Sequence, residues 1–245
     1  MNRTVLITGA SGGIGKACAV AFWQKGCKVV LHYFAHGDEI QSLCRNMNET
    51  RPNSAITIPA DITSREQVDA LFSQAEAAFG SVDVLVNNAG TAQQKLFTDL
   101  SDDDWNRMFD VNMKGTFYCC QRAVPSMIRQ KQGKIVNVSS MWGQVGASCE
   151  VHYSAAKGAV IAFTKALAKE LGPSGIQVNC VAPGIIDTPM NGHLTPETID
   201  ALKEETPLGT IGTPQDVAES ILFLSSPESD FITGQVLAPN GGIVI

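Results

Sequence analysis

Short runs of β-branched and other apolar residues alternate along the chain with longer segments in which apolar residues recur at helical spacing. The short runs predict strands and the longer segments predict helices, because side chains share a face at every second residue in a strand and about every 3.6 residues in a helix. The expected strands are 4–8, 28–33, 54–59, 82–87, 134–139, 176–182 and 235–238. The expected helices are about 12–24, 37–49, 64–79, 102–130, 151–171 and 213–224.

The composition of the predicted strands indicates the fold class. Runs such as 82–86 are nearly continuous in apolar residues, which is typical of parallel strands that are covered on both faces. Strict alternation of strand and helix predicts right-handed crossovers between neighbouring parallel strands. We therefore expect an α/β protein with a doubly wound parallel sheet of about seven strands and helices on both faces.

One alternating pattern uses nearly all of the 245 residues, so we expect a single domain over 1–245. The segment 184–212 interrupts the rhythm and carries Pro189, Pro196 and Pro207. Long irregular segments inside compact domains are usually functional. We predict that 184–212 is an insertion that covers a ligand.

Charge and composition exclude several classes of protein. The chain has 18 Lys and Arg against 24 Asp and Glu, a net charge of −6, with no block of like charge. A nucleic-acid-binding surface needs clustered cations, so no nucleic-acid partner is expected. No apolar run approaches the roughly 18 residues of a membrane span, and no membrane partner is expected.

The seven cysteines include no Cys-x-x-Cys pair and are expected to be reduced thiols. The first predicted strand begins at Thr4, which leaves no room for a signal peptide, so a cytoplasmic protein is expected. The four histidines do not cluster, and we assign no metal site.

A glycine-rich turn joins the first predicted strand to the first predicted helix. Its pattern is Gly9-x-x-x-Gly13-x-Gly15, which matches neither G-x-G-x-x-G nor a Walker A loop and so disfavours a P-loop phosphotransferase. Glycines at such a turn let backbone N–H groups approach a pyrophosphate at the helix N-terminus. The alternative is a glycine-rich turn without a ligand.

Other polar residues follow predicted strands at the same edge of the sheet. Asp61 comes just after the third strand, where an adenine is expected, although it could equally cap the next helix. Asn87, Asn88, Ala89 and Gly90 end the fourth strand. Ligands of open α/β sheets bind outside these carboxyl ends.

The candidate reactive residues lie in the second half of the chain. Tyr153 and Lys157 are four residues apart in a predicted helix and share one face. The ammonium is expected to lower the phenol pKa from its ordinary value near 10, so that Tyr153 could donate a proton to a carbonyl. Ser140 follows the fifth strand and is placed to hydrogen-bond the same oxygen. Asn112 is a poor helix former at an otherwise apolar site, and a surface or kink position is the alternative.

Taken together, these motifs resemble the short-chain dehydrogenase/reductase family. The resemblance runs from Thr8 to Gly242 and rests on the glycine turn, the Asn-Asn-Ala-Gly run, Asn112, Ser140, Tyr153 with Lys157, and Pro183 with Gly184, in this order. It implies a Rossmann-like fold and a reductase that transfers hydride between a nicotinamide cofactor and a carbonyl.

The resemblance also implies residue roles. Tyr153 would be the catalytic acid and base, Lys157 would lower its pKa and bind ribose, Ser140 would orient the carbonyl, and Asn112 would hold a water in a proton relay. Thr188 would contact the carboxamide of the nicotinamide. The implied cofactor-binding residues are Gly9, Ser11, Gly12, Gly13, Ile14, Gly15, Tyr33, Asp61, Ile62, Asn88, Ala89, Gly90, Tyr153, Lys157, Pro183, Gly184, Ile186 and Thr188.

Cofactor choice depends on the end of the second strand. Members that use NAD usually carry an acid there, whereas this chain has Tyr33. NADP(H) is therefore favoured over NAD(H), although Gly12 and Phe34 occupy the positions where an arginine would be usual.

Two substrate classes follow from the resemblance. Residues 232–235 and 240–242 are similar to 3-oxoacyl-[acyl-carrier-protein] reductases, whose partner is acyl carrier protein; Lys131 matches one basic position and Ser174 occupies the other. Residues 139–143 and 146–151 are similar to a narrower group that reduces the 5-aminopentanone group on elongation factor P. Trp142, Gln144 and Glu150 would then contact a cationic amine, and Met190 is a further substrate candidate.

The apolar end 243–245 and the family resemblance predict a homotetramer. The expected substrate is a small or carrier-bound ketone. A function of another class, a non-catalytic dinucleotide sensor on the same fold, is the alternative.

Overall fold

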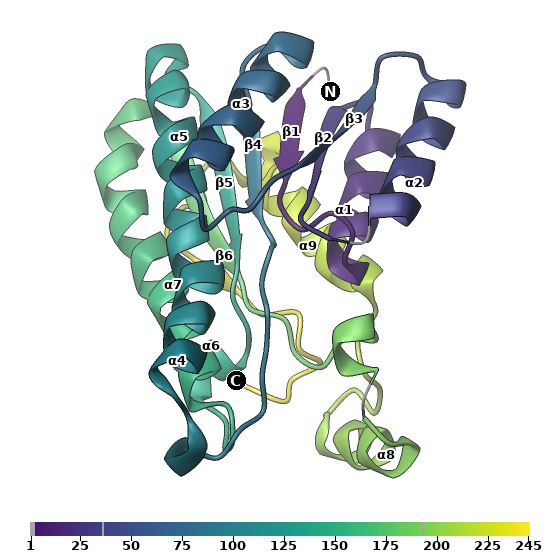
Figure 1. The fold of residues 1–245 in the computed structure, drawn as a ribbon, viewed down its shortest axis with the longest axis vertical. Helices are drawn as coiled ribbons and strands as arrows, with labels where there is room; N and C mark the ends of the chain where they lie inside the picture. Colours follow the sequence, from purple (N-terminus) through teal and green to yellow (C-terminus); the bar gives the residue numbers. More distant parts are fainter. Residues whose placement is uncertain (1–2, 36, 193) are drawn as a thin grey trace.

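The computed structural model describes residues 3–35, 37–192 and 194–245. A seven-stranded parallel sheet with the order β3-β2-β1-β4-β5-β6-β7 forms the centre (Figure 1). The strands are β1 (Thr4–Ile7), β2 (Lys28–Tyr33), β3 (Ala55–Pro59), β4 (Val84–Asn87), β5 (Gly133–Val138), β6 (Ile176–Val181) and β7 (Val236–Leu237). The strand order reverses between β1 and β4, which is where open α/β sheets bind ligands.

Helices cover both faces of the sheet. They are α1 (Gly13–Gln24), α2 (Gly37–Thr50), α3 (Arg65–Phe79), α4 (Asp102–Phe109), α5 (Gly115–Gln130), α6 (Trp142–Val145), α7 (Val151–Leu171), α8 (Pro196–Glu205) and α9 (Pro214–Leu224). Apolar side chains of α1, α2 and α9 share one buried cluster, and those of α3, α5 and α7 share the other (Figure 1). The predicted doubly wound α/β fold is confirmed.

The local sequence explains where most elements begin. All residues of β1, β4 and β5 are buried, as their apolar runs predict for strands covered on both faces. Ser64, Ser101 and Thr213 cap the N-termini of α3, α4 and α9 by accepting a hydrogen bond from a backbone N–H of the first turn. The seven cysteines are unpaired thiols, and all except Cys149 are buried.

The predicted helix 102–130 is interrupted. It consists of α4, one π-helical turn η2 (Asp110–Lys114) and α5. Within η2 the Asn112 amide donates to the carbonyl oxygens of Met108, at 3.0 Å, and of Thr91 in a neighbouring loop, at 2.9 Å. Competition of this side chain with the backbone ladder accounts for the wider turn.

The segment 184–212 also differs from the prediction, because it contains regular structure. A short 3-10 turn, η4, spans Pro189–Asn191, and α8 begins at Pro196. Both prolines stand at the start of a helical turn, where a missing N–H is harmless, and Thr195 caps α8 through the N–H of Thr198. Of the three prolines that suggested an irregular loop, Pro189 and Pro196 therefore mark helix starts, and Pro207 follows the end of α8.

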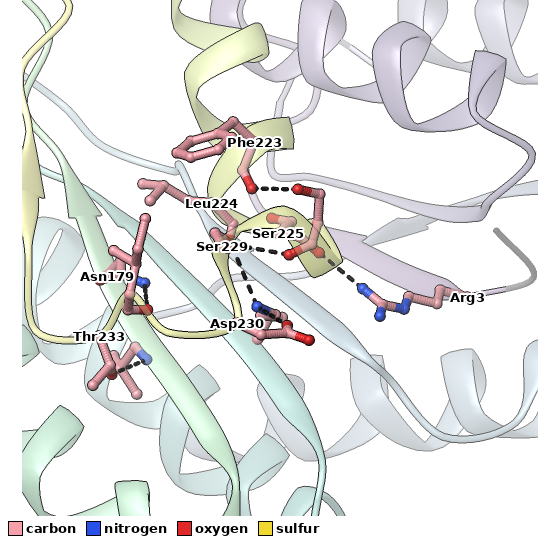
Figure 2. A network of polar contacts seen from close by, with 12 residues as sticks. Arg3, Asn179, Phe223, Leu224, Ser225, Ser229, Asp230 and Thr233 are labelled. Carbon is pink, nitrogen blue, oxygen red and sulfur yellow. Dashed lines mark hydrogen bonds and ion pairs between the residues drawn. The ribbon is translucent and has the colours of Figure 1, made fainter.

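Polar contacts hold the chain after α9 against the sheet at the edge opposite the glycine turn. Figure 2 shows the Arg3 guanidinium reaching the carbonyl oxygen of Ser225, at 2.8 Å, and Ser229 lying between the end of α9 and Asp230. Ser229 is fully buried and its hydroxyl donates to the Leu224 carbonyl. Lys134 of β5 places Nζ 2.7 Å from Asp230 Oδ1; its side chain is 5% exposed, against 65% for Asp230.

We expect Asp230→Ala to lower the free energy of unfolding by about 1–2 kcal/mol, because it leaves a nearly buried ammonium without its carboxylate. Lys134→Met removes the charge as well, so Asp230→Ala in that background should cost much less. Urea unfolding at constant m measures both effects. Asp200→Ala is the control, since its partner Lys203 is well exposed. An unchanged urea midpoint in Asp230→Ala would contradict the assignment.

Candidate active site

A cleft of about 1440 Å³ lies at the carboxyl ends of the strands. Its volume exceeds the roughly 300–1,000 Å³ of an ordinary small-molecule site. Residues after β1, β2, β3, β4, β5 and β6 line it, together with parts of α4 and α8. Of the predicted site residues it brings together Gly9, Ser11, Gly12, Gly13, Ile14, Asp61, Ile62, Asn88, Ala89, Gly90, Asn112, Ser140, Trp142, Glu150, Tyr153, Lys157, Pro183, Gly184, Ile186, Thr188 and Met190.

The glycine turn is shaped by close backbone contacts. Gly9 has φ +65°, and a Cβ there would lie 2.8 Å from Ala89 Cα. A Cβ on Gly15 would overlap the Gly9 carbonyl oxygen and lie 2.8 Å from Ala10 Cα. The Thr8 hydroxyl accepts from the N–H groups of Asn88 and Ala89, both at 3.0 Å, which ties the turn to the end of β4. Side chains larger than hydrogen would therefore displace this turn.

The turn also fits an anion. Gly12 caps α1 without a side-chain hydrogen bond, and the first turn of α1 carries no acidic residue. Its leading N–H groups and the positive end of the helix dipole therefore remain for a phosphate. The residues present fit a dinucleotide pyrophosphate at this place.

The His32 side chain of β2 is hydrogen-bonded to the backbone of the glycine turn. The imidazole is buried; Nδ1 accepts from the Gly9 N–H at 3.1 Å, so the proton is on Nε2, which lies 2.9 Å from the Ala60 carbonyl oxygen. Burial lowers the pKa of His32, which favours this neutral form. One side chain thus joins the ends of β1, β2 and β3.

The adenine side differs from the prediction. Tyr33 is not among the residues that line the cleft: strand side chains alternate between faces, and the Tyr33 hydroxyl accepts from Gln41 of α2 at 2.8 Å. Phe34, 72% exposed, and Ala35 line the cleft in its place. Asp61 lines the cleft and accepts at Oδ1 from the N–H and hydroxyl of Thr63, both at 2.8 Å, whereas Ser64 is the cap of α3.

Three of the predicted catalytic residues meet at the ends of β5 and α7. Tyr153 is 9% exposed, and the Ser140 side chain lies close enough to interact with its hydroxyl. The Ser140 hydroxyl also accepts from the Trp142 N–H at 3.2 Å. Lys157 is buried one helical turn further on, with Nζ 5.8 Å from the Tyr153 ring centroid and 3.0 Å from the Val138 carbonyl oxygen. Two hydroxyls therefore lie close enough for one carbonyl oxygen to accept from both.

The pKa of Tyr153 corrects a sequence expectation. Burial raises it to about 12, the Ser140 hydrogen bond opposes the rise, and the charge of Glu150 adds to it. Burial also lowers the pKa of Lys157 to about 8. The predicted lowering of the phenol pKa is absent in this arrangement, because desolvation of the buried phenol is the largest effect on it. The Tyr153 hydroxyl is consequently protonated at neutral pH and can act as a proton donor.

Asn112 completes the arrangement from η2. It is 1% exposed, and its Oδ1 accepts from the Thr91 N–H at 3.3 Å. A Cβ on Gly90 would lie 2.7 Å from Asn112 Oδ1 and 3.2 Å from Lys157 Nζ. Only a glycine at position 90 leaves both side chains in place, and the π-helical turn brings Asn112 to that point.

Another predicted residue lies elsewhere. Gln144 is exposed on α6 and is not among the residues that line the cleft. The preceding Gly143 packs against the α7 backbone, where a Cβ would lie 2.7 Å from the Lys157 carbonyl carbon, and the next side chain therefore faces away.

Sequence reasoning missed many of the residues that line the cleft. They include Thr91, Ala92, Gln93, Gln94, Asp103, Asn106, Arg107, Asp110, Leu194, Thr198 and Leu202. Residues 91–94 follow β4 at the carboxyl edge, so the rule for open α/β sheets contained the signal. The others come from α4, η2 and the α8 region, whose positions depend on tertiary packing.

In the described ranges, 3–35, 37–192 and 194–245, no group of three or more His, Cys, Asp or Glu is placed to hold a metal ion. None of the helices in the same residues has the length and apolar content that would let it span a membrane.

Comparison with known proteins agrees with this geometry. A family model described as enoyl-(acyl carrier protein) reductase matches residues 9–244. An uncharacterised oxidoreductase of Bacillus subtilis, YmfI, is 40% identical over 242 residues, 99% of each chain. The 3-oxoacyl-[acyl-carrier-protein] reductase FabG of Thermotoga maritima is 40% identical over 244 residues, 100% of this chain and 98% of the relative.

A solved structure has the same fold. The crystal structure of a short-chain dehydrogenase/reductase, described as a glucose/ribitol dehydrogenase, from Brucella melitensis superposes with a TM-score of 0.93 at 38% identity. It covers 100% of this chain and 97% of its own. The family implies an oxidoreductase with a nicotinamide cofactor, which the glycine turn and the Ser140, Tyr153 and Lys157 arrangement fit. This chain belongs to the short-chain dehydrogenase/reductase family.

Proposed function

We propose that the protein is an NADPH-dependent carbonyl reductase that acts on 3-oxoacyl thioesters. The observation that carries this proposal is that Tyr153, Ser140 and Lys157 line the same cleft as the glycine turn. The relatives named 3-oxoacyl-[acyl-carrier-protein] reductase support the thioester class.

The residues divide the work of reduction. A nicotinamide cofactor held at the glycine turn would supply the hydride that reduction of a carbonyl requires. Tyr153 and Ser140 donate hydrogen bonds to the carbonyl oxygen, and Tyr153 gives up its proton as negative charge develops there. Lys157, charged below pH about 8, stabilises the resulting phenolate. Asn112, across Gly90 from Lys157, would hold a water that returns the proton.

The end of β2 supports NADPH over NADH. Tyr33, Phe34 and Ala35 present no carboxylate to the cleft there, so nothing at these positions repels a 2′-phosphate or binds a 2′-hydroxyl as an acid would. The Ser11 hydroxyl donates to the Ala35 carbonyl at 3.4 Å and brings the glycine turn beside this strand end. We expect kcat/KM at least about 10-fold higher with NADPH, a difference of about 1.4 kcal/mol.

A second candidate substrate is a ketone that carries a cation, such as the 5-aminopentanone group on elongation factor P. Glu150, Asp103 and Asp110 line the substrate side of the cleft, where Arg107 is the basic lining residue on α4. Gln94 donates to Glu150 Oε1 at 3.2 Å. This acidic lining favours an ammonium and disfavours the acidic surface of acyl carrier protein.

Steady-state oxidation of NADPH, followed by its absorbance, tests the proposal. The substrates are acetoacetyl-acyl carrier protein, the acetoacetyl thioester of N-acetylcysteamine, elongation factor P bearing 5-aminopentanone, and a trimethylammonio-substituted methyl ketone with its neutral alkyl analogue. We expect turnover of the acetoacetyl thioester. The second candidate predicts a preference for the cationic ketone that falls about 10-fold in Glu150→Gln.

Binding and turnover together separate the classes of function. Tight NADPH binding without turnover of any substrate would support a dinucleotide sensor and reject a reductase. Turnover of the thioesters alone would reject the cationic ketone. Light scattering of the same preparation tests the predicted homotetramer.

A further inference from the structure

A chain of partly buried hydrogen bonds lies beside the cleft and plays no part in the mechanism above. It begins at His152, which directly precedes Tyr153 and is fully buried. His152 Nε2 lies 3.1 Å from Gln93 Oε1, and Gln93 Nε2 donates to Asp104 Oδ1 at 2.9 Å. Gln93 itself lines the cleft.

The Asp104 carboxylate, at the end of this chain, determines how the side chains of Gln93 and His152 are oriented. The Asp104 carboxylate also accepts from Lys95 Nζ at 2.6 Å and from the hydroxyl and N–H of Ser101 at 2.7 and 3.0 Å. These donors, Lys95 first, hold the pKa of Asp104 well below its usual range, so it only accepts. The Gln93 nitrogen must therefore face Asp104, and its oxygen must face His152.

The orientation of Gln93 in turn determines the tautomer of the His152 imidazole. A donor is needed opposite Gln93 Oε1, so Nε2 of His152 carries the proton. Burial lowers the pKa of His152; Asp104 opposes this effect and Lys95 adds to it. A neutral ring leaves Nδ1 as a bare acceptor, and this atom has no hydrogen-bond partner among the described residues.

The backbone around Gln93 is held as firmly as its side chain. The Lys95 N–H donates to the Cys149 carbonyl oxygen at 2.8 Å, next to the start of α7. The Lys95 ammonium binds Asp104 on α4. Segment 91–95 is thus fixed between α4 and α7, with the Gln93 amide at the cleft wall.

Two hydrogen-bonding positions of Gln93 are left over. Among the residues that the structure describes, one N–H is used by Asp104 and one lone pair by His152, so one N–H and one lone pair remain on an amide that is fixed in place. Either position can serve an amide group: the N–H can donate to an amide oxygen, or the carbonyl oxygen can accept from an amide N–H. We propose that Gln93 is a specificity-determining residue that binds an amide group of the ketone substrate, with His152 and Asp104 as its positioning residues.

This inference rests on the proposed reductase function and narrows its substrate class to ketones that carry an amide a few atoms from the carbonyl. Two probes test it: the acetoacetyl thioester of N-acetylcysteamine, which has such an amide, and S-pentyl 3-oxobutanethioate, which lacks it. The wild type should have a KM about 10-fold lower for the amide probe at similar kcat.

Variants distinguish recognition of the substrate amide by Gln93 from an effect of His152 on the neighbouring Tyr153. Gln93→Met should abolish the preference for the amide probe and leave kcat for the S-pentyl probe within about twofold. His152→Phe should do the same, and His152→Gln, which retains a side-chain N–H, should restore part of the preference. Gln121→Met is the matched control, because Gln121 pairs with Arg65 on the outer side of α5.

Each measurement has a result that would overturn the proposed role of Gln93 or His152. Equal preference in Gln93→Met and wild type would overturn the role of Gln93. A fall in kcat for both probes in His152→Phe, at unchanged KM, would mean that His152 acts through Tyr153 and would overturn the positioning role. Nitrogen NMR of the wild type should show the neutral Nε2–H tautomer of His152, and the opposite tautomer contradicts the assigned chain without any assay.

Calorimetry of the amide probe keeps the two proposals distinguishable. Absence of turnover with both probes would reject the reductase function. Weaker binding of the amide probe to Gln93→Met than to wild type, in the presence of NADP⁺, would still support the amide site.

Discussion

Tyr153→Phe should lower kcat for ketone reduction by about 10²–10⁴-fold and leave the affinity for NADPH unchanged. A positioned general acid contributes about this factor, and phenylalanine removes only the oxygen that carries the proton. Ser140 keeps its hydrogen bond from Trp142 and can still contact the carbonyl. Single-turnover kinetics with the acetoacetyl thioester and fluorescence titration with NADPH measure the two quantities.

The fold should tolerate this change. The aromatic ring of Tyr153 packs with Met108 and Ala156, and phenylalanine retains those contacts. Tyr118→Phe is the matched control, because the Tyr118 ring of α5 lies against the Arg65 guanidinium of α3, away from the cleft. Retention of more than a tenth of wild-type kcat in Tyr153→Phe would show that another group delivers the proton.

Lys157→Met should both inactivate the enzyme and stabilise the fold. Loss of the ammonium removes the charge beside the forming phenolate, and we expect kcat to fall by about 100-fold or more. Burial lowers the pKa of Lys157 from 10.5 to about 8, which corresponds to about 3 kcal/mol of destabilisation of the charged form. The variant also loses the hydrogen bond from Lys157 to the Val138 carbonyl oxygen, which lowers the free energy of unfolding by about 1 kcal/mol. We therefore expect a net increase in the free energy of unfolding of about 2 kcal/mol.

The stability gained in Lys157→Met should depend on pH, because the Lys157 pKa differs between the folded and unfolded chain. Between pH about 8 and 10.5 the unfolded chain still binds the Lys157 proton that the folded chain has released, so wild-type stability rises with pH in this window. The gain from Lys157→Met is therefore complete below pH about 8 and shrinks above it. Urea unfolding at about pH 7 and about pH 10 measures the difference. A constant gain at both pH values would show that the variant acts through packing instead of charge.

The sequence predicted the fold because its information is local. Continuous apolar strands and alternating helices depend on near neighbours, and the structure contains them close to where they were expected. The break at η2 was foreseen only as the alternative of a kink at Asn112, because it depends on the contact of Asn112 with Thr91, a residue 21 positions away. The helix in 184–212 was missed because its prolines break a helix in one position and begin it in another.

The sequence by itself determined which residue types occupy the site: the glycines of the turn, Ser140, Tyr153 and Lys157 stand in recognisable order. Only the tertiary structure decided how they behave. Burial raises the phenol pKa where neighbour spacing predicted a fall, because desolvation depends on every atom packed around a group. The same reason applies to Gln93 and His152: their orientations follow from Asp104, which packing of α4 against the cleft brings into reach.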